Sequence, residues 1–429
     1  MKQEIRAAVS NEKNLKQIAE GKTKLIFGVE GQNDVVLVRS KNRLTAFNAA
    51  RSSEIEGKGA IANQTTCHIF DYLKAVGIKS HFVGAVNECD FVASKCEMIP
   101  IEWVARRVAT GSFLKRNPGV KEGYSFASPK IETFFKDDAN DDPQWSDEQI
   151  ISTKFSFNGV TIGVREVQMM KKQTDVIFRL LEKAWHIQDC ALIDMKIEFG
   201  VTPAGDIVLA DVIDNDSWRV WPRGDKRLQL DKQFYRDLDK VTDEALTQLK
   251  GNYQKVADIT KKFTTEAKTR VVIIMGSASD MDFANKIADK AKALGLLAVK
   301  RVCSAHKTTD DALRIVTEFE ADFFPTVFVA IAGRSNGLGP VVASNTTLPV
   351  INAPPAAADW AAQDIWSSLR MPSGVGCSTV LGADEAALAA AKLMSQHDHM
   401  IFGRILAQQL NNRIGILKAD AIAERESQA

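Results

Sequence analysis

One segment, residues 270–280 (RVVIIMGSASD), constrains the fold more than any other part of this chain. Its apolar run predicts a buried strand, and the run stops at a glycine that leads into an Ala- and Lys-rich helical pattern. At such a turn, free backbone N–H groups and the positive end of the helix dipole face the same point. The sequence therefore predicts an anion site here, formed by Gly276, Ser277, Ser279 and Asp280.

The rest of the second half repeats this alternation of strand and helix. Apolar runs at 326–333 and 348–353 follow helical patterns at 281–294 and 309–320. Such alternation is typical of parallel βαβ units, so we expect an α/β three-layer domain with a parallel sheet, flavodoxin/Rossmann-like. An Ala- and Leu-rich helical stretch follows at 383–426, and either core packing or an oligomer contact would explain its apolar stripe.

The first half has shorter strands in a less regular order. β-rich runs at 22–29 and 34–40 precede a helical pattern at 60–76, and a second helical pattern covers 164–186. Two further runs, 190–214, read as a hairpin with its turn at a Pro-Ala-Gly sequence. These features predict an α+β domain.

Polar stretches mark the expected surface segments and joints. Residues 131–149 are acidic and contain a proline, so we expect a surface loop there. A charged helical stretch from 231 to 262 leads into a polar segment. We therefore predict a first domain over 1–260, a linker over 261–269 and a second domain over 270–429.

The bulk composition excludes several classes of protein. A chain of 429 residues has room for two or three domains, and a net charge of +1 provides no basic field for nucleic acid. No apolar run approaches the roughly 18 residues of a membrane span, and the N-terminus lacks a secretory core segment. The six cysteines are scattered without a CxxC pair, which argues against a zinc site or disulfide framework. We expect a cytosolic protein that binds neither nucleic acid nor membrane.

Two cationic segments of the first half suit phosphate groups. Lys22 and Lys24 lie at a glycine turn, where ammonium groups can reach several phosphate oxygens, although a solvated basic turn explains them as well. The spacing differs from that of a Walker loop. Residues 106–116 (RRVATGSFLKR) place arginines around a Gly-Ser turn, which suits a phosphate monoester or a carboxylate. A cationic helix end capped by glycine is the alternative.

An acidic group on the predicted hairpin is the strongest signal of the first half. Glu198 lies on one strand, and Asp211, Asp214 and Asp216 lie at the end of the other. Carboxylates gathered in an apolar hairpin repel one another unless a divalent cation joins them, and oxygen ligands favour magnesium bound together with substrate phosphates. Solvated turn carboxylates remain the alternative for Asp214 and Asp216. Arg219 follows and would balance a second anion.

At these residues the first half resembles the phosphoribosylaminoimidazole-succinocarboxamide (SAICAR) synthetase family, over about residues 15–260. The similar segments are EGKTK, IEWVARRVATGSFLKR, DMKIEFG and LADVIDNDSWRVWP. The resemblance implies that ATP phosphorylates a substrate carboxylate, which the amine of aspartate then attacks. It implies that Lys22, Lys24 and Lys196 bind ATP, that Glu198 and Asp211 bind magnesium, and that Arg106, Ser112, Asp216 and Arg219 bind the substrate.

Three loops of the second half would meet at the carboxyl edge of the parallel sheet, where open sheets bind ligands. They are 276–280 (GSASD), 304–310 (SAHKTTD) and 332–340 (AGRSNGLGP). His306, beside Lys307, can hold or move a proton near neutral pH, although a lone loop histidine is usually a polar surface group. The glycines of the third loop permit close approach to a ligand or simply tight packing. Ser304, Arg334, Ser335 and Asn336 supply further hydrogen-bond donors for a ligand. Residues 366–380 add a second, glycine-rich rim to the expected site.

These loops resemble the phosphoribosylaminoimidazole carboxylase family over about residues 269–429. The resemblance implies that the first loop holds the phosphate of aminoimidazole ribotide (AIR). It also implies that Ser335 fixes CO2 and that His306, helped by Lys307, removes the proton from the attacking carbon. The microbial form typically carries an AGGAAH-like third loop, whereas this chain has AGRSNG. This departure is similar to the animal form, class II, which uses CO2 directly without ATP or biotin.

Together the halves resemble the animal bifunctional family of de novo purine synthesis, which implies a homo-octamer acting on AIR, CO2, L-aspartate and ATP. Two other hypotheses compete with this one. A non-catalytic binding protein would have no chemical need for Glu198, Asp211, Lys22 and His306. A small-molecule kinase would explain the first half and leave the three loops of the second half unexplained.

Overall fold

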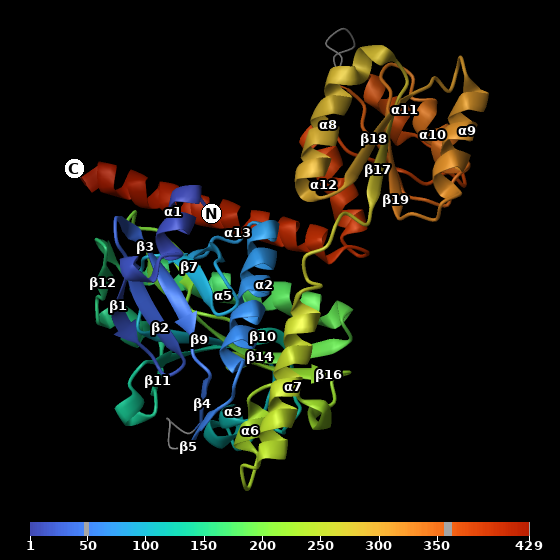
Figure 1. The fold of residues 1–429 in the computed structure, drawn as a ribbon. Helices are drawn as coiled ribbons and strands as arrows, with labels where there is room; N and C mark the ends of the chain where they lie inside the picture. The colour runs from blue at the N-terminus through green and yellow to red at the C-terminus, as the bar shows by residue number, and fades with distance from the viewer. Residues whose placement is uncertain (47–50, 356–362, 429) are drawn as a thin grey trace. The chain divides into compact units, whose positions relative to one another are not determined.

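The chain forms two compact units, drawn in Figure 1, in a computed structural model that describes residues 1–46, 51–355 and 363–428. Unit 1 comprises residues 1–264 and 409–429, and unit 2 comprises residues 265–408. Helix α13, His399–Gln428, begins in unit 2, and its residues from Gln409 onward belong to unit 1. The second domain predicted from the sequence therefore extends beyond unit 2 by this segment.

Unit 1 is built on two antiparallel sheets, which agrees with the α+β prediction. The first sheet has the order β1-β2-β3-β7-β6, and the second has the order β11-β10-β9-β14-β15, with β8 and β16 also paired to β14. Two small hairpins, β4–β5 and β12–β13, complete the strands. The bounds are β1 Leu15–Glu20, β2 Lys24–Val29, β3 Gln32–Ser40, β4 Arg43–Ala46, β5 Arg51–Glu54, β6 Phe82–Ala85, β7 Asp90–Ser94, β8 Glu97–Met98, β9 Ile101–Val108, β10 Ser125–Phe135, β11 Gln144–Trp145, β12 Ser156–Phe157, β13 Val160–Thr161, β14 Cys190–Val201, β15 Ile207–Ala210 and β16 Trp218–Pro222.

Two long helices cover these sheets. α2 packs against β3, β6 and β7, and α5 packs against β14, β9 and β10. The buried side of α5 carries Val167, Met170, Ile177 and Leu181 at helical spacing, which is why the sequence pattern revealed this helix. The helices of unit 1 are α1 Gln3–Val9, α2 Lys58–Val76, α3 Ser112–Arg116, α4 Asp147–Ser152, α5 Val164–Ile187, α6 Gln233–Arg236 and α7 Asp243–Thr260.

The prediction of a surface loop at 131–149 is wrong for much of that segment. Residues up to Phe135 belong to β10, which pairs with β9, and the segment continues through β11 into α4. Glu132 and Thr133 are buried. The acidic composition was misleading because Glu132 accepts hydrogen bonds from two arginines, which compensate for the burial of its charge.

Helical patterns predicted as single stretches are interrupted in the structure. The stretch 231–262 forms α6 and α7, and the stretch 383–426 forms α12, Ala383–Met394, followed by α13. The second interruption lies at Asp398, whose carboxylate accepts a hydrogen bond from the backbone N–H of Met400 at 2.8 Å. The predicted polar linker contains Phe263, which is fully buried against Tyr72 and Trp185.

Unit 2 is a single parallel sheet with helices on both faces, as the sequence predicted. The sheet has the order β18-β17-β19-β20-β21, and every neighbouring pair is parallel. This is the 2-1-3-4-5 order of flavodoxin-like folds. The elements are β17 Arg270–Met275, α8 Met281–Leu294, β18 Leu297–Val302, α9 Thr309–Glu320, β19 Thr326–Ile331, α10 Leu338–Ser344, β20 Val350–Asn352, α11 Trp366–Leu369 and β21 Ser378–Thr379.

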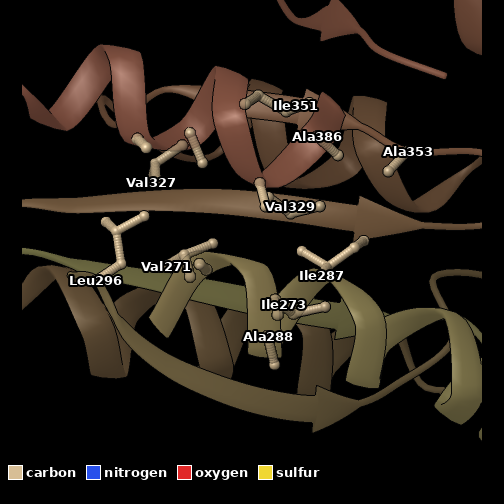
Figure 2. Close-up of a cluster of buried hydrophobic side chains, with 14 of the residues drawn as sticks. Val271, Ile273, Ile287, Ala288, Leu296, Val327, Val329, Ile351, Ala353 and Ala386 are labelled. Carbon is tan, nitrogen blue, oxygen red and sulfur yellow. The ribbon is translucent and has the colours of Figure 1, made fainter. Parts of the chain in front are cut away.

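The side chains of β17 alternate between the two faces of this sheet. Val271 and Ile273 join a core with α8 and α12, which Figure 2 shows in close-up. Val272 and Ile274 join a second core with α9 and α10. Because both faces are covered, the strand is apolar from Val271 to Met275, as the run VVIIM indicated. Within the described ranges no helix is long and apolar enough to cross a membrane.

Candidate active sites

A cavity of about 890 Å³ in unit 1 gathers most of the residues predicted for the first half. Strand β2 and the turn before it, strand β14, and the loop after β15 all contribute to its lining. The predicted residues that line it are Lys22, Lys24, Lys196, Glu198, Asp211 and Asp216. The predicted substrate residues Arg106, Ser112 and Arg219 lie elsewhere in the unit and form a second group, described below.

Glu198 and Asp211 are brought together by the β14–β15 hairpin. Glu198 stands opposite Ala210 in the register, so Asp211 follows directly beside it. Glu198 is 2% exposed and accepts hydrogen bonds from Lys196 Nζ at 2.7 Å and from Lys136 Nζ at 2.8 Å. Burial acts to raise the pKa of Glu198, but these two lysines outweigh it and lower that pKa to about 2. Glu198 is therefore ionised at neutral pH.

Asp211 has the opposite electrostatic environment. Its burial, and next the charge of Glu198, raise its pKa to about 6. Its φ of 59° lies in the left-handed region, which is uncommon for a residue other than glycine. A cation bound beside both carboxylates would remove their repulsion. The described ranges contain no group of three or more His, Cys, Asp or Glu that could hold a metal. Two carboxylates suit a magnesium ion, because this ion usually takes its other ligands from phosphates and water.

The two aspartates that follow are not solvated turn residues. Asp214 is buried and accepts a hydrogen bond from Lys24 Nζ at 3.2 Å. Asp216 lies 3.4 Å from Lys58 Nζ and 3.5 Å from Lys232 Nζ, and it accepts a hydrogen bond from the Tyr253 hydroxyl. Burial opposes ionisation of Asp216, but the neighbouring lysines hold its pKa below the usual value. The cavity is therefore a set of paired charges.

Lys22 differs from Lys24 in its surroundings. Lys22 is exposed and forms an ion pair with Asp138 at 2.7 Å, whereas Lys24 is buried. Lys22 lines the cavity from the turn that precedes β2, and Lys24 lines it as the first residue of that strand. The alternative of a fully solvated basic turn therefore does not apply to Lys24.

Arg106, Ser112 and Arg219 form the second group. Arg106 on β9 and Arg219 on β16 both donate to Oδ2 of Asp194, at 2.6 and 2.5 Å. A Cβ atom added at Gly111 would lie 2.7 Å from Arg219 Nη2, so the turn that carries Ser112 lies against this guanidinium. Gly111 also has a φ of 60°, which glycine adopts without strain. The three predicted residues are therefore adjacent to one another.

Sequence reasoning missed three lysines that pair with carboxylates of the cavity: Lys58, Lys136 and Lys232. Lys58 and Lys136 lie 158 and 62 residues along the chain from the carboxylates that they contact. The wrongly predicted loop at 131–149 concealed Lys136. Had IETFF been interpreted as a strand, Lys136 would have been placed at the end of that strand, where site residues gather.

In unit 2 the three predicted loops emerge at the carboxyl edge of the sheet. Gly276 follows β17, Ser304 follows β18 and Arg334 follows β19. β17 and β19 are neighbours, although β18 separates them in the sequence. The chain direction across the sheet reverses between them, and such a switch point forms a crevice for ligands. The first and third loops leave the sheet on either side of this point.

His306 lies against the third loop. A Cβ atom added at Gly337 would be 2.7 Å from His306 Nε2, so the imidazole occupies the space that a side chain would fill. His306 and Lys307 are exposed, and the turn that carries them is closed by a hydrogen bond from the Thr308 backbone N–H to the Ser304 carbonyl at 2.8 Å. The second and third loops are thus in direct contact.

The third loop is held by Ser368, which lies in the predicted rim of residues 366–380, and by Asp364, which the sequence did not single out. The buried amide of Asn336 donates to Ser368 Oγ at 3.0 Å and accepts from the Gly339 N–H at 2.9 Å. The N–H of Arg334, whose φ is 56°, donates to Asp364 at 2.9 Å. The side chains of Arg334 and Ser335 are exposed, while Asn336 faces the interior of the loop.

The first loop is a small hydroxyl turn. Ser277 Oγ accepts hydrogen bonds from the backbone N–H and from the hydroxyl of Ser279, at 3.2 and 2.8 Å. Burial raises the pKa of Asp280, which begins α8. The turn therefore offers exposed hydroxyl and N–H groups at the start of a helix of 14 residues.

Comparison with known proteins matches each half to a family. A profile of SAICAR synthetase matches residues 17–253, and a profile of AIR carboxylase matches residues 270–413. The "Probable multifunctional protein ADE2" of Caenorhabditis elegans is 58% identical over 412 residues, which cover 96% of this chain and 97% of that protein. The human "Bifunctional phosphoribosylaminoimidazole carboxylase/phosphoribosylaminoimidazole succinocarboxamide synthetase" is 53% identical over 94% of this chain and 96% of its own length.

A solved structure supports the fold of the first half. The phosphoribosylaminoimidazole-succinocarboxamide synthase of Ehrlichia chaffeensis superposes with a TM-score of 0.52 at 30% identity. The match covers 58% of this chain and all of that one. The two family profiles cover most of the chain, and the relatives are similar to it over nearly its whole length. This chain therefore belongs to the family of bifunctional AIR carboxylase and SAICAR synthetase enzymes of purine biosynthesis.

Proposed function

We propose that unit 2 carboxylates AIR with CO2 directly, as a class II carboxylase without biotin, and that unit 1 joins the product to L-aspartate with ATP and magnesium. The observation that carries the first part is the contact of His306 with the AGRSNG loop at the switch point of the sheet. The paired carboxylates of the large cavity carry the second part.

In unit 1, Lys22, Lys24 and Lys196 would hold the phosphates of ATP. A similar solved structure, described as "SAICAR synthetase (Type-2) in complex with ADP", supports nucleotide use. Glu198 and Asp211 would hold the magnesium ion, which supplies charge stabilisation to the transferring phosphoryl group. Asp216 would contact the substrate from the cavity wall.

The cationic group of Arg106, Ser112 and Arg219 would bind the ribose phosphate of the carboxylated substrate. Guanidinium groups suit phosphate because they donate several parallel hydrogen bonds. Ser112, at the start of α3, adds an exposed hydroxyl. The substrate carboxylate would then extend toward the cavity, where phosphorylation makes it reactive to the aspartate amine.

In unit 2, the hydroxyls and N–H groups of Gly276, Ser277 and Ser279, with Asp280, would bind the AIR phosphate and ribose. Ser304 of the second loop, with Arg334 and Asn336 of the third loop, would complete this binding site for AIR. Carbon 4 of the aminoimidazole attacks CO2 held at Ser335, forming a carbon–carbon bond. His306, helped by Lys307, then takes the proton from carbon 4, which restores the aromatic ring.

A two-stage assay tests the proposal. The enzyme is given AIR and bicarbonate-derived CO2 without ATP, and ATP, magnesium and aspartate are added afterwards. We expect carboxylation in the first stage and SAICAR in the second. Absence of the first reaction, with ligation of supplied carboxyaminoimidazole ribotide intact, would reject the CO2-dependent class and leave the synthetase assignment standing.

The domain boundaries 1–260, 261–269 and 270–429, the homo-octamer and the cytosolic location are further parts of this proposal. Large apolar side chains exposed on unit 2 support self-association: Leu297, Val302, Phe323, Trp366, Leu369, Leu381 and Leu393. All six cysteines, which lie within the described ranges, are free thiols and suit a reducing compartment. Light scattering on purified protein tests the octamer, and limited proteolysis tests the linker.

A further inference from the structure

A row of four charged residues crosses four adjacent strands of unit 1. Glu132 lies on β10, Arg106 on β9, Asp194 on β14 and Arg219 on β16. The register places Asp194 directly opposite Arg106 on one side and directly opposite Arg219 on the other. Opposite charges at facing positions of neighbouring strands attract, so the sheet itself places Asp194 between the two arginines.

The contacts along the row are short and shared. Oδ2 of Asp194 accepts from Nη1 of Arg106 at 2.6 Å and from Nη1 of Arg219 at 2.5 Å. Nε of Arg106 donates to Glu132 at 2.6 Å, and Arg116 donates to the other oxygen of Glu132 at 2.9 Å. Asp194 and Arg106 are each 4% exposed. One carboxylate oxygen thus holds two guanidinium groups in a buried setting.

The charges of this network do not cancel. Arg106, Arg116 and Arg219 carry three positive charges, and Glu132 and Asp194 carry two negative charges, which leaves a net charge of +1. Without Asp194, the guanidinium groups of Arg106 and Arg219 would repel each other. Arg219 has little freedom to move in one direction because the backbone at Gly111 lies against it.

We infer that Asp194 is a positioning residue of the synthetase: it fixes the guanidinium groups of Arg106 and Arg219 beside Ser112 so that both meet the phosphate of the substrate. The inference rests on the proposed role of those three residues as the phosphate site. Asp194 itself touches no substrate atom in this arrangement and acts through the two arginines. A misplacement of about 1 Å at such a site can reduce activity about 100-fold.

Asp194→Asn distinguishes this role from simple charge neutralisation. The substitution keeps the shape and raises the net charge of the network from +1 to +2. Electrostatic attraction alone would then lower the KM for carboxyaminoimidazole ribotide. Loss of positioning would raise that KM, by about 10- to 100-fold, while the KM for ATP stays constant. A fall in the substrate KM, or no change, would overturn the inference.

Glu182→Gln is the matched control. Glu182 accepts two hydrogen bonds from Arg107, the neighbour of Arg106, at 2.5 and 2.8 Å. We expect this variant to keep its substrate KM, because Arg107 has no proposed part in phosphate binding. The carboxylase rate of each variant, measured on the same full-length preparation, reports whether the protein as a whole is intact.

Three more variants keep the test decisive. Should Asp194→Asn fail to fold, Asp194→Glu retains the charge but moves it by one methylene, and an unchanged substrate KM there would overturn the inference. Arg106→Ala and Arg219→Ala test the phosphate site itself. Unchanged KM values in those two would reject the proposed site, whereas raised values there with a normal KM in Asp194→Asn would reject only the role of Asp194. Ribose 5-phosphate, tested as a competitive inhibitor, should lose affinity in parallel with the substrate.

Discussion

The two active sites of this chain present charge to their ligands in different ways. In unit 1 most of the functional carboxylates are buried and paired with cations, as Glu198 is with Lys136 and Lys196. In unit 2 they stand on exposed loops, and His306 and Ser335 are reached directly from solvent. The first site is held by side-chain ion pairs within a sheet, and the second by hydrogen bonds that join backbone and uncharged side-chain groups of its loops to one another and to Asp364 and Ser368.

This difference follows from the chemistry that each site performs. Phosphoryl transfer moves several negative charges, and pre-organised cations in a water-poor cavity stabilise that charge most effectively. Carboxylation of an electron-rich ring needs one proton acceptor and a few donors, which loops at a sheet edge can supply. A substitution in the site of unit 1 should therefore change the charge balance of several neighbouring side chains. A substitution in the site of unit 2 should affect only the residue that is replaced and its immediate contacts.

The sharpest separation of the two sites is expected from His306→Asn. Asparagine cannot accept the proton at neutral pH, so carboxylation should fall by about 100- to 10,000-fold, while ligation of supplied carboxyaminoimidazole ribotide continues. Separate assays of the two steps measure this. His397→Asn, which changes an exposed histidine of the same unit, is the control. Normal carboxylation in His306→Asn would remove His306 from the mechanism.

The converse variant is Asp211→Asn. Loss of one of two carboxylates from the proposed magnesium site should reduce ligation by about 100-fold and leave carboxylation unchanged. Raising the magnesium concentration should restore part of the rate. Asp206→Asn, on the exposed turn of the same hairpin, should behave as the parent enzyme. An equal loss of carboxylation in Asp211→Asn would indicate misfolding in place of a lost ligand.

The buried charges of unit 1 should also appear in its stability. Burial raises the pKa of Asp231 from 3.8 to about 6, so the folded state binds an extra proton between about pH 4 and pH 6. The contribution of Asp231 to the free energy of unfolding of unit 1 should therefore rise as the pH falls from 6 to 4, by up to about 3 kcal/mol.

Denaturant titrations of the parent protein and of Asp231→Asn, at several pH values, check this expectation. The difference in unfolding free energy between the two proteins should depend on pH across that window, because only the parent carries the Asp231 carboxyl group. A constant difference would show that Asp231 has an ordinary pKa. Because a protein of two units need not unfold in one step, the unfolding of unit 1 is followed through the fluorescence of its own tryptophans, such as Trp185 and Trp218.

A smaller and purely local effect is expected from Gly337→Ala in unit 2. The backbone of Gly337 has a φ of −79°, which alanine adopts freely, but the new Cβ would meet the ring of His306. Because His306 is exposed, its ring can move aside without unfolding, and carboxylation should fall by about tenfold. Gly376→Ala has open space around it and should remain active. Full activity in Gly337→Ala would argue against a fixed position of His306.

Much of unit 2 was predictable because its information is local. The run VVIIM is apolar throughout, so its burial on two faces follows from composition alone. The three loops come directly after strands, and the carboxyl edge of a parallel sheet collects them. What could not be predicted is the support of the third loop by Asp364 and Ser368, because these contacts depend on where the chain returns after β20.

Unit 1 was less predictable because its site depends on register between distant strands. Glu198 and Asp211 were found because a hairpin is a local structure. Asp194 lies in the segment DMKIEFG but was not selected, since its partners Arg106 and Arg219 are on other strands and only the pairing of those strands brings them together. Glu132 was assigned to a loop for the same reason. The role of a charged residue in a strand cannot be recognised from the sequence until its partner on another strand is known.

The division of α13 between the units has a consequence for the order in which the chain is made. Arg165 in α5 forms ion pairs with Asp420 and Glu424, and Asp206 pairs with Lys418. These partners leave the ribosome only after the whole of unit 2, roughly 7 to 30 seconds after residue 264 has been added. During that interval unit 1 must keep its shape without its final helical segment. Synthesis of unit 2 thus separates the two parts of unit 1 in time, although they are together in the finished protein.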